Sequence, residues 1–484
     1  MRRRGKAVVG VFGIGLAAYW PQFPGLRERL ENYQRQVEQR VGEWAVVTSG
    51  GLVDDAESAV QAGEAFLRAG VDLIFCYVGT YATSSQVLPV VQAPRVPVVV
   101  LTLQPRAALD YPRTDTGEWL ANCSACCVPE ISCAFARGGI DFHLVTGMLE
   151  PEPDVREPSE SAWKEVREWC EAAGVVRNLR NAHIGFLGHT YPGMLDLYSD
   201  FTRVQAELGT HLEVLEMCDL EERFEATTDA ETRRKEEEVR RIFVVSEDSP
   251  SDALARQPSP EALSWACRVA VALDKMSDDF RLAGLAYYYR GLGGNRYEQL
   301  AAGMTVGCSL LTARGIPCSG EGDLKNCLAM KILDLLGAGG SFTEIYALDF
   351  REGFVLMGHD GPFHLDIAEG KPVLRGLGLF HGKRGFGVSV EASVRQGPIT
   401  ILGLTETREG RLKVLAAQGE SLPGERLRIG NTNSRLRFKL GPREFLNAWC
   451  AQGPTHHCAL GIGHVQGKLE KAASLLGLEM DVIC

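Results

Sequence analysis

The 484-residue sequence lacks the features of several large classes of protein. No apolar run approaches the roughly 20 residues that a membrane-spanning helix needs. There is no excess of positive charge either, because 62 acidic residues outnumber 51 basic ones and give a formal net charge of −11. A surface that binds nucleic acid or an anionic membrane would need a basic face. We therefore expect neither nucleic acid nor a membrane among the partners of this protein.

The sequence also lacks the cysteine spacing of a small disulfide-stabilised domain. Its 14 cysteines are scattered along the chain, which is typical of reduced thiols in the cytoplasm. One dense group holds Cys123, Cys126, Cys127 and Cys133, but its single C-x-x-C has no second pair to complete a zinc site. Small residues that line a buried turn are the favoured interpretation, with a zinc or redox site as the alternative. The basic start is not followed by a signal-peptide cleavage pattern, so we expect a cytoplasmic protein.

Strand and helix patterns alternate through the first two thirds of the chain. Uninterrupted apolar runs at 7–12, 71–78 and 96–103 are typical of parallel strands covered on both faces. A helical repeat of apolar residues over 26–41 follows the first of them. A second α/β pattern opens at residue 182.

The last third of the sequence changes character. Runs at 388–394, 398–407 and 411–420 are separated by short polar turns, which predicts an antiparallel meander. Two helices are predicted late in the chain, over 443–451 and 467–477. We therefore expect an α/β protein with two parallel-sheet, Rossmann- or flavodoxin-like domains followed by a β-rich, antiparallel, barrel-like domain. The expected domains are residues 1–178, 179–320 and 321–484.

A glycine-rich turn follows the first predicted strand. Gly13, Gly15 and Ala18 fit G-x-G-x-x-G/A, the turn that lays a helix N-terminus against a dinucleotide pyrophosphate. The acidic residue expected about 20 positions further on would be near Glu38, inside the predicted helix rather than at the end of a strand. Pro21 also stands where the phosphate-facing helix should begin. We expect a tight strand-to-helix turn and no nucleotide cofactor.

Carboxylates that could support chemistry gather in residues 319–364. Glu321 and Asp323 precede a helix predicted over 324–336, where the helix dipole favours carboxylates and where both could be simple capping acids. Glu344 stands in a predicted strand whose alternating face also carries Phe342, Tyr346, Leu348 and Phe350. A buried and unpaired carboxylate is costly, so Glu344 should hold a proton, a cationic partner or a metal.

Histidines supply the complementary donors. His359 ends an apolar strand before an Asp-Gly turn, where a single histidine is more often structural. His456 and His457 follow a Gly-Pro helix stop, and His464 is a weaker candidate. Two carboxylates with two imidazoles suit Mn²⁺, Co²⁺ or Mg²⁺ and leave positions open for substrate oxygens.

Four segments carry a family resemblance. "GEGDLKN", "SFTEIYALDF", "VLMGHDGPFH" and "GPTHHCALG" resemble, in order and spacing, the motifs of L-arabinose isomerases and their L-fucose isomerase relatives. The resemblance implies two α/β domains, a β-rich C-terminal domain, a divalent metal (usually Mn²⁺) and conversion of an aldose to its ketose through an enediol. It implies that the metal ligands are Glu321, Glu344, His359 and His457. The two glutamates are also the implied catalytic residues.

The same resemblance implies where the sugar is bound. Gln22 corresponds to a glutamine of the N-terminal domain that contacts sugar, often in the site of a neighbouring subunit. Where the family shows N-Q-T-A-H, this chain has Cys123 and Cys126 in place of glutamine and histidine, and thiols are poor hydrogen-bond donors. We expect these residues, with Asp323 and His456, to contact the substrate, and the sugar preference to differ from L-arabinose.

The resemblance also implies a homo-oligomer, a trimer or hexamer, with the active site near a subunit interface. Two other functions stay open at this point. One is a nicotinamide-dependent dehydrogenase that uses the glycine-rich turn, and the other is a non-catalytic sugar-binding protein on the isomerase scaffold.

Overall fold

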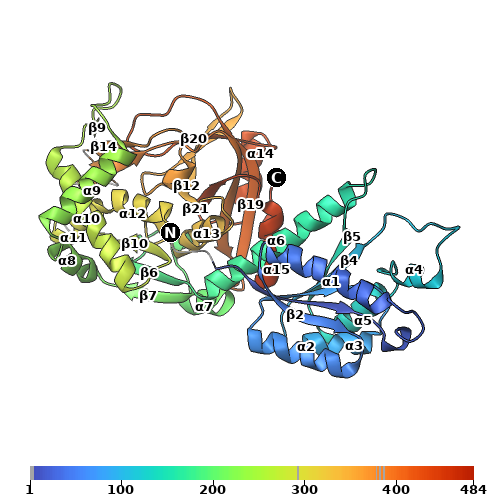
Figure 1. Ribbon diagram of the computed structural model, residues 1–484. Coiled ribbons are helices and arrows are strands. Elements are labelled where there is room, and N and C mark those ends of the chain that lie inside the picture. Colours follow the sequence, from blue (N-terminus) through green and yellow to red (C-terminus); the bar gives the residue numbers. More distant parts are fainter. Residues whose placement is uncertain (1–4, 291–293, 378, 381–382, 385–386) are drawn as a thin grey trace. The chain divides into compact units, whose positions relative to one another are not determined.

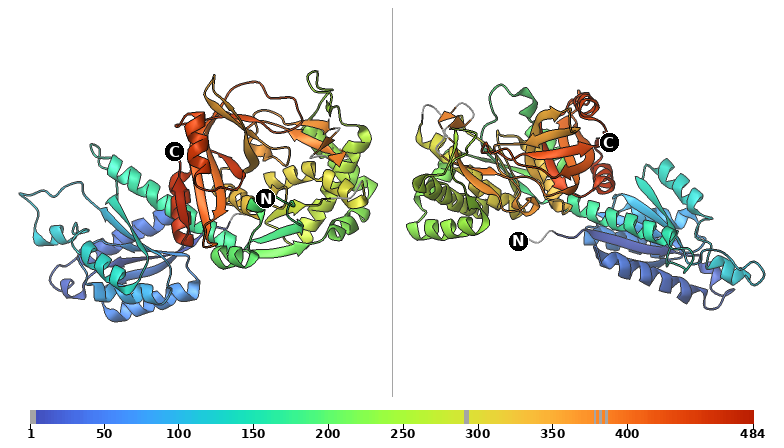
Figure 2. Two further views of the ribbon diagram at one scale, coloured as in Figure 1. Left: turned by 180° about the vertical axis from the view of Figure 1, so that it is seen from behind. Right: turned by 90° about the horizontal axis from the view of Figure 1, so that it is seen from above.

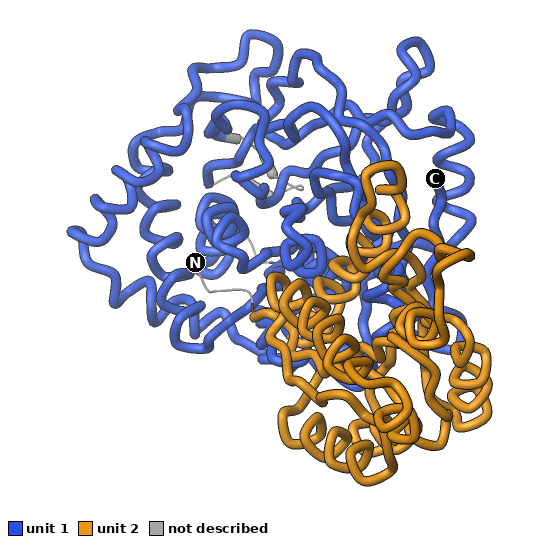
Figure 3. The backbone as a smooth tube through the Cα atoms, turned by 45° about the vertical axis from the view of Figure 1, so that its right-hand side comes forward, with its two compact units in different colours: residues 1–3, 178–484 blue, residues 4–177 orange. Residues whose placement is uncertain are grey.

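The computed structural model describes residues 5–290, 294–377, 379–380, 383–384 and 387–484 (Figure 1). The chain divides into two compact units, an N-terminal unit of residues 4–177 and a C-terminal unit of residues 178–484 (Figure 3). Among the described helices, none is long and apolar enough to cross a membrane. The division of the chain into three domains at residues 178 and 320 stays a prediction.

The N-terminal unit is built around a five-stranded parallel sheet with the order β2-β1-β3-β4-β5, as in flavodoxin-like folds. The strands are β1 (Val8–Ile14), β2 (Val46–Val53), β3 (Leu73–Tyr77), β4 (Val98–Gln104) and β5 (Phe142–Met148). Figure 1 shows α1 and α6 on one side of the sheet and α2 and α3 on the other. Because helices cover both faces, the central strand β3 is buried along its whole length.

The helices of this unit follow the expected alternation with strands. They are η1 (Ala17–Tyr19), α1 (Leu26–Gly42), α2 (Ala56–Ala69), α3 (Ser84–Gln92), α4 (Thr116–Leu120), α5 (Val128–Gly138) and α6 (Glu157–Arg180). Helix α1 does not follow β1 directly, because the 3₁₀ turn η1 and a loop separate them.

The glycines of the turn after β1 permit close packing within the unit. A Cβ on Gly13 would lie 2.7 Å from Oε1 of Gln34, and one on Gly15 would lie 2.8 Å from the Trp20 ring. Gln34 comes from α1 and Trp20 from the loop before it. These contacts support the interpretation of the motif as a strand-to-helix turn.

The C-terminal unit begins with a second parallel sheet, in the order β11-β10-β6-β7. Its strands are β6 (His183–Gly188), β7 (His211–Leu215), β10 (Gly284–Tyr288) and β11 (Cys318–Ser319). Its helices are η2 (Leu195–Leu197), α7 (Phe201–Leu208), α8 (Met217–Glu225), α9 (Asp229–Ile242), α10 (Pro260–Asp279), α11 (Arg296–Ala302), α12 (Met304–Ala313) and α13 (Leu324–Leu335). Helix α13 confirms the helix predicted from the apolar repeat after Asp323.

The rest of the unit is a β-barrel with the strand order β18-β21-β12-β13-β20-β19-β22. The additional pairing of β18 with β19 closes the ring, and Figure 2 shows these orange to red strands curving round a common axis. Neighbours are antiparallel except β19 and β22. The strands are β12 (Ser341–Asp349), β13 (Phe354–Gly358), β18 (Gly397–Glu406), β19 (Leu412–Leu422), β20 (Ser434–Phe438), β21 (His457–Ile462) and β22 (Glu479–Val482). Two parallel sheets and this barrel confirm the predicted fold class.

Smaller elements complete the unit. The helices α14 (Pro442–Cys450) and α15 (Gln466–Leu476) confirm the two late helices, and η3 covers Leu365–Ile367. The predicted three-strand meander is wrong in its first member, because β17 (Val388–Glu391) pairs with β14 (Val373–Leu377) outside the barrel. The remaining short strands are β8 (Val244–Val245), β9 (Ala255–Arg256), β15 (Leu379–Phe380) and β16 (Lys383–Arg384).

The alternating face predicted for β12 is interrupted by a register shift. The pairing of β12 with β13 shifts between Ile345 and Ala347, so the side chains after the shift change face. Ile345 and Leu348 accordingly pack against the same apolar core. The predicted set that ran from Phe342 to Phe350 therefore does not share one face, and Phe350 lies beyond the strand with 73% of its surface exposed.

Gly358 is needed where β13 ends beside the barrel interior. The carbonyl oxygen of Thr432 approaches it so closely that a Cβ on Gly358 would lie 1.8 Å from that oxygen. Thr432 also binds the backbone of His359, since its N–H and hydroxyl donate to the His359 carbonyl over 2.8 and 2.9 Å.

We expect Gly358→Ala to lower the free energy of unfolding of the C-terminal unit by about 1–3 kcal/mol, because main chain must move to admit the methyl group. Urea unfolding followed by circular dichroism measures this. Gly42→Ala, where a Cβ meets nothing within 4 Å, serves as the control and should not destabilise the protein. Equal unfolding midpoints for the two variants would contradict the packing described for Gly358.

Candidate metal centre

Three neighbouring barrel strands bring two histidines and a glutamate together. Strand β12 lies between β13 and β21, and Glu344 pairs with Gly358 on one side and with His457 on the other. His359 follows Gly358 directly. One donor atom from each of Glu344, His359 and His457 lies within 4.8 Å of the other two.

Glu321 reaches the same place from the parallel sheet of the unit. It stands in the loop between β11 and α13 and has a left-handed backbone, with φ of 59°. Two backbone hydrogen bonds hold this loop. The N–H of Tyr191 donates to the carbonyl of Glu321 over 2.9 Å, and the N–H of Gly322 donates to the carbonyl of Tyr287 in β10 over 3.0 Å. A residue other than glycine is strained in this conformation, and such strain persists only where the surroundings hold it.

The Glu321 side chain faces two histidines. Its Oε2 lies 3.4 Å from Nε2 of His457 and 3.6 Å from Nε2 of His456. Glu321, His456 and His457 thus form a second group whose donor atoms lie within 4.8 Å of one another. The four predicted ligands therefore form two overlapping groups that share His457, with Glu321 in one and Glu344 in the other.

The charges in the centre support one another. Burial by itself raises the pKa of Glu321. Hydrogen bonds from His456 and His457 and the charge of the imidazoles outweigh burial and bring this pKa far below its usual range. Burial lowers the pKa of His457, but Asp323 and Glu321 outweigh that effect and raise it to about 9. A carboxylate thus faces a proton-holding imidazole, and a divalent cation would replace that proton because metal ligands bind in their deprotonated forms.

Two aspartates fix the orientation of the neighbouring histidines. Oδ2 of Asp323 lies 2.9 Å from Nδ1 of His457, and neither side chain has any exposed surface. Oδ2 of Asp196 lies 2.7 Å from Nδ1 of His456 and also accepts its backbone N–H over 2.9 Å. Because each Nδ1 is bound to a carboxylate, each Nε2 is directed at Glu321. This is the arrangement by which carboxylates orient metal-binding imidazoles.

Aromatic packing completes the walls of the centre. The Phe342 ring lies 4.0 Å from that of His359 and 4.5 Å from that of His457, between centroids. Nδ1 of His359 accepts a hydrogen bond from the backbone N–H of Gly361 over 3.1 Å. His359 is 3% exposed and His457 is fully buried, so both rings have little freedom to rotate.

The residues present fit a divalent cation. Nε2 of His457 is buried, and apart from its 3.4 Å approach to Oε2 of Glu321 it makes no well-aligned hydrogen bond with the residues that the structure describes. Burial of such a nitrogen without a well-formed hydrogen bond is costly. Imidazole nitrogens and carboxylate oxygens from Glu321, Glu344 and His359 surround it. Such a donor set suits a divalent ion of intermediate hardness.

The residues predicted to contact a sugar have different surroundings. His456 is about one third exposed beside Glu321. Asp323 is fully buried, and its second oxygen caps α13 by accepting the N–H of Asn326, which favours a positioning role over direct contact with substrate. Asp196 was not predicted, because nothing in its own segment distinguishes it from other surface acids.

The other three predicted contacts lie in the N-terminal unit. Gln22 lines a cavity of about 1080 Å³ and donates from Nε2 to the carbonyl of Ala18. The Sγ atoms of Cys123 and Cys126 lie 2.9 Å apart as free thiols. Burial and the neighbouring Cys126 raise the pKa of Cys123 to about 12. Contact of these three residues with a sugar stays a prediction.

Comparison with known proteins adds an independent observation. No family model matches the chain. The L-arabinose isomerase of Clavibacter sepedonicus is 23% identical over 310 residues, which are 62% of this chain and 59% of that protein. Those of Aeromonas salmonicida and Thermotoga maritima are 22% and 23% identical, over 72% and 67% of this chain and 70% and 62% of their own lengths. The matched part thus spans less than two thirds of the first and third of these relatives. The matches confirm the resemblance that the motifs indicated.

We expect Asp323→Asn to weaken binding of Mn²⁺ by about 10- to 100-fold, the usual cost of losing a carboxylate that orients a metal-binding histidine. The helix cap should survive, because asparagine caps helices as well as aspartate does. Calorimetric titration of EDTA-treated protein measures the affinity.

Asp349→Asn is a matched control, since Asp349 accepts backbone hydrogen bonds from Arg351 and Glu352 and lies outside the centre. The same Mn²⁺ affinity in both variants would show that Asp323 does not position His457 for a metal.

Proposed function

We propose that this chain, which is an L-arabinose isomerase-like protein, interconverts a free, unphosphorylated aldose and its ketose. The reaction is an intramolecular oxidation and reduction, in which C2 of the sugar is oxidised as C1 is reduced. The observation that carries the proposal is the convergence of donors from three separated segments on His457. Two carboxylates beside a cluster of imidazoles supply groups that can accept and return the protons of this reaction.

The proposed metal ligands are Glu321, Glu344, His359 and His457, and the proposed ion is Mn²⁺, with Co²⁺ or Mg²⁺ as substitutes. When bound, the ion would act as a Lewis acid that polarises the sugar oxygens. One glutamate removes the proton from C2, and a proton is returned at C1. The other glutamate moves the hydroxyl proton between O1 and O2. His456, held by Asp196 and partly exposed, donates a hydrogen bond to a sugar oxygen.

The identity of the sugar is set by residues outside this centre. We propose that Gln22, Cys123 and Cys126 contact the substrate bound in a neighbouring subunit of a trimer or hexamer. Two thiols in place of an amide and an imidazole remove strong hydrogen-bond donors, so the preferred sugar differs from L-arabinose. All 14 cysteines are free thiols, which supports a reducing compartment, and we propose the cytoplasm.

A nicotinamide-dependent dehydrogenase is not favoured. The glycines on which that alternative depended pack against Gln34 and Trp20. Formation of ketose in the assay described next distinguishes an isomerase from a protein that only binds sugar.

The test is to strip the protein with EDTA, restore Mn²⁺ and incubate it in D₂O with a panel of pentoses, hexoses and deoxysugars. We expect one or more sugars to give ketose with deuterium from solvent at C1, because an enediol exchanges its proton. The EDTA-treated protein without added metal is the control and should form no ketose. Failure to convert any sugar in the panel, with Mn²⁺ shown to be bound, would contradict the proposed function.

We expect Glu321→Gln and Glu344→Gln each to lower kcat by about 10²- to 10⁴-fold, the range attributed to one general acid or base. Steady-state kinetics on the best sugar measures the effect, with bound metal quantified in the same preparations. Glu420→Gln, on the exposed part of β19, is the control and should keep the original kcat. A near-normal kcat in either test variant would remove that glutamate from the mechanism.

A further inference from the structure

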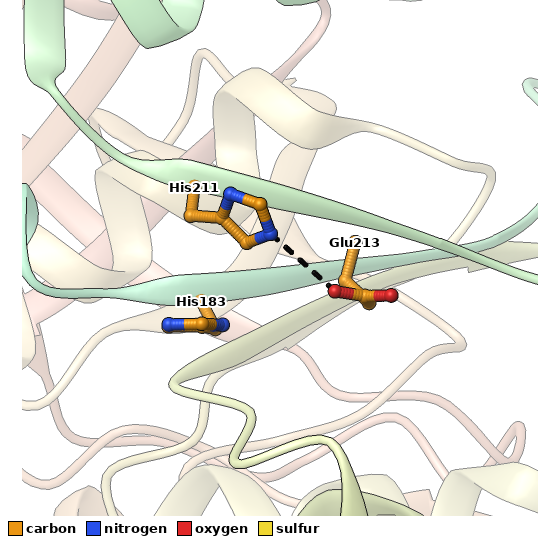
Figure 4. Close-up of side chains that lie close together, drawn as sticks. All are labelled: His183, His211 and Glu213. Carbon is orange, nitrogen blue, oxygen red and sulfur yellow. Dashed lines mark ion pairs between the residues drawn. The ribbon is translucent and has the colours of Figure 1, made fainter.

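A second cluster of metal-binding side chains lies on the parallel sheet of the C-terminal unit. Strands β6 and β7 are parallel neighbours in which His183 pairs with His211 and Gly185 pairs with Glu213. His211 and Glu213 are two residues apart on β7, so their side chains leave the same face of the strand. Figure 4 shows both imidazole rings and the carboxylate close together on that face.

The spacing of the three donors is near that of a metal site. Nε2 of His211 lies 3.4 Å from Oε2 of Glu213, and one donor atom from each residue lies within 4.8 Å of the other two. Tetrahedral Zn²⁺ with ligand bonds of about 2.0–2.1 Å holds neighbouring ligand atoms about 3.3 Å apart. The His211–Glu213 pair already has this spacing, and a donor atom of His183 lies within 4.8 Å of both.

The surroundings allow an ion to enter. The side chain of His211 is 52% exposed and that of Glu213 is 35% exposed, while the His183 and His211 rings are in contact at 4.7 Å between centroids. Burial, His211 and the positive charge of Arg281 lower the pKa of His183. The Glu213 carboxylate opposes the charge of Arg281.

We propose that His183, His211 and Glu213 form a second divalent-metal site, with Zn²⁺ as its ion, that holds strand β7 to β6. Two imidazoles and one carboxylate are a known zinc donor set, and water completes the tetrahedron. Within the described part of the sheet β7 is an edge strand, paired only with β6. An ion bound across the two strands therefore stabilises the folded state, because the unfolded chain does not hold the three donors together. This site shares no residue with the centre in the barrel and does not depend on the proposed isomerase activity.

The test is calorimetric titration of the EDTA-treated full-length protein with ZnCl₂, with Co²⁺ absorption spectra as a report of tetrahedral coordination. His211→Ala should lose one equivalent of bound Zn²⁺ or bind it more than about 100-fold more weakly, since even the loss of a second-layer partner costs 10- to 100-fold. Glu213→Gln, which keeps the size of the side chain, should weaken the binding of the same equivalent of Zn²⁺. The rise in Tm caused by Zn²⁺ should shrink in both variants.

Val214→Ala is the matched control, because Val214 lies on the opposite face of the same strand and is exposed. It should bind Zn²⁺ as the unchanged protein does. His457→Asn changes only the centre in the barrel, so this variant should keep the equivalent of bound Zn²⁺ that depends on His211. It thereby distinguishes the two sites. Equal stoichiometry, affinity and Co²⁺ spectra in His211→Ala and Val214→Ala would show that the cluster is an ordinary surface ion pair and would overturn the proposal.

Discussion

The hydrogen bond between Nδ1 of His457 and the Asp323 carboxylate is the interaction on which the candidate centre depends. It is fully buried, and it connects the start of barrel strand β21 to the cap of helix α13, which follows the parallel sheet. With Nδ1 held, Nε2 of His457 must face Glu321. This buried contact is one of those that join the parallel sheet to the barrel, and it orients the residue that both groups of candidate ligands share. A change that weakens the hydrogen bond between His457 and Asp323 therefore affects both the orientation of the imidazole and the start of helix α13.

Strand register supplies the other half of the geometry. Glu344 lies beside His457 and Gly358 because β12 is the middle one of three antiparallel strands. The carbonyl of Thr432 approaches Gly358, and the N–H and hydroxyl of Thr432 donate to the carbonyl of His359, so Thr432 holds the turn after β13 in place. Register also places His183 opposite His211 on the parallel sheet. The two clusters differ in surroundings, since the one in the barrel is buried and aromatic while the one on β6 and β7 is open to solvent.

Much of this architecture could be predicted from local patterns. Continuous apolar runs predicted the parallel strands, and the apolar repeat after Asp323 predicted α13, because burial of an apolar face largely decides such elements. The shift within β12 and the departure of β17 to another sheet could not be predicted, since both depend on which strand lies alongside. Asp196 was missed for the same reason: it is far from His456 in sequence, and only folding brings them together. His183, His211 and Glu213 also gave no motif, because they belong to two strands.

The sequence by itself determined the types of side chain available and the elements that carry them. It supplied the glutamates and histidines in motifs that resemble those of L-arabinose isomerases, on strands and loops whose periodicity is local. Only the tertiary structure decided that His457 would lie between two carboxylate-bearing segments and that each neighbouring imidazole would be held by an aspartate. The reason is physical: periodicity and capping act over a few residues, whereas the position of a donor atom to within an ångström depends on strand register and packing between segments far apart in the chain.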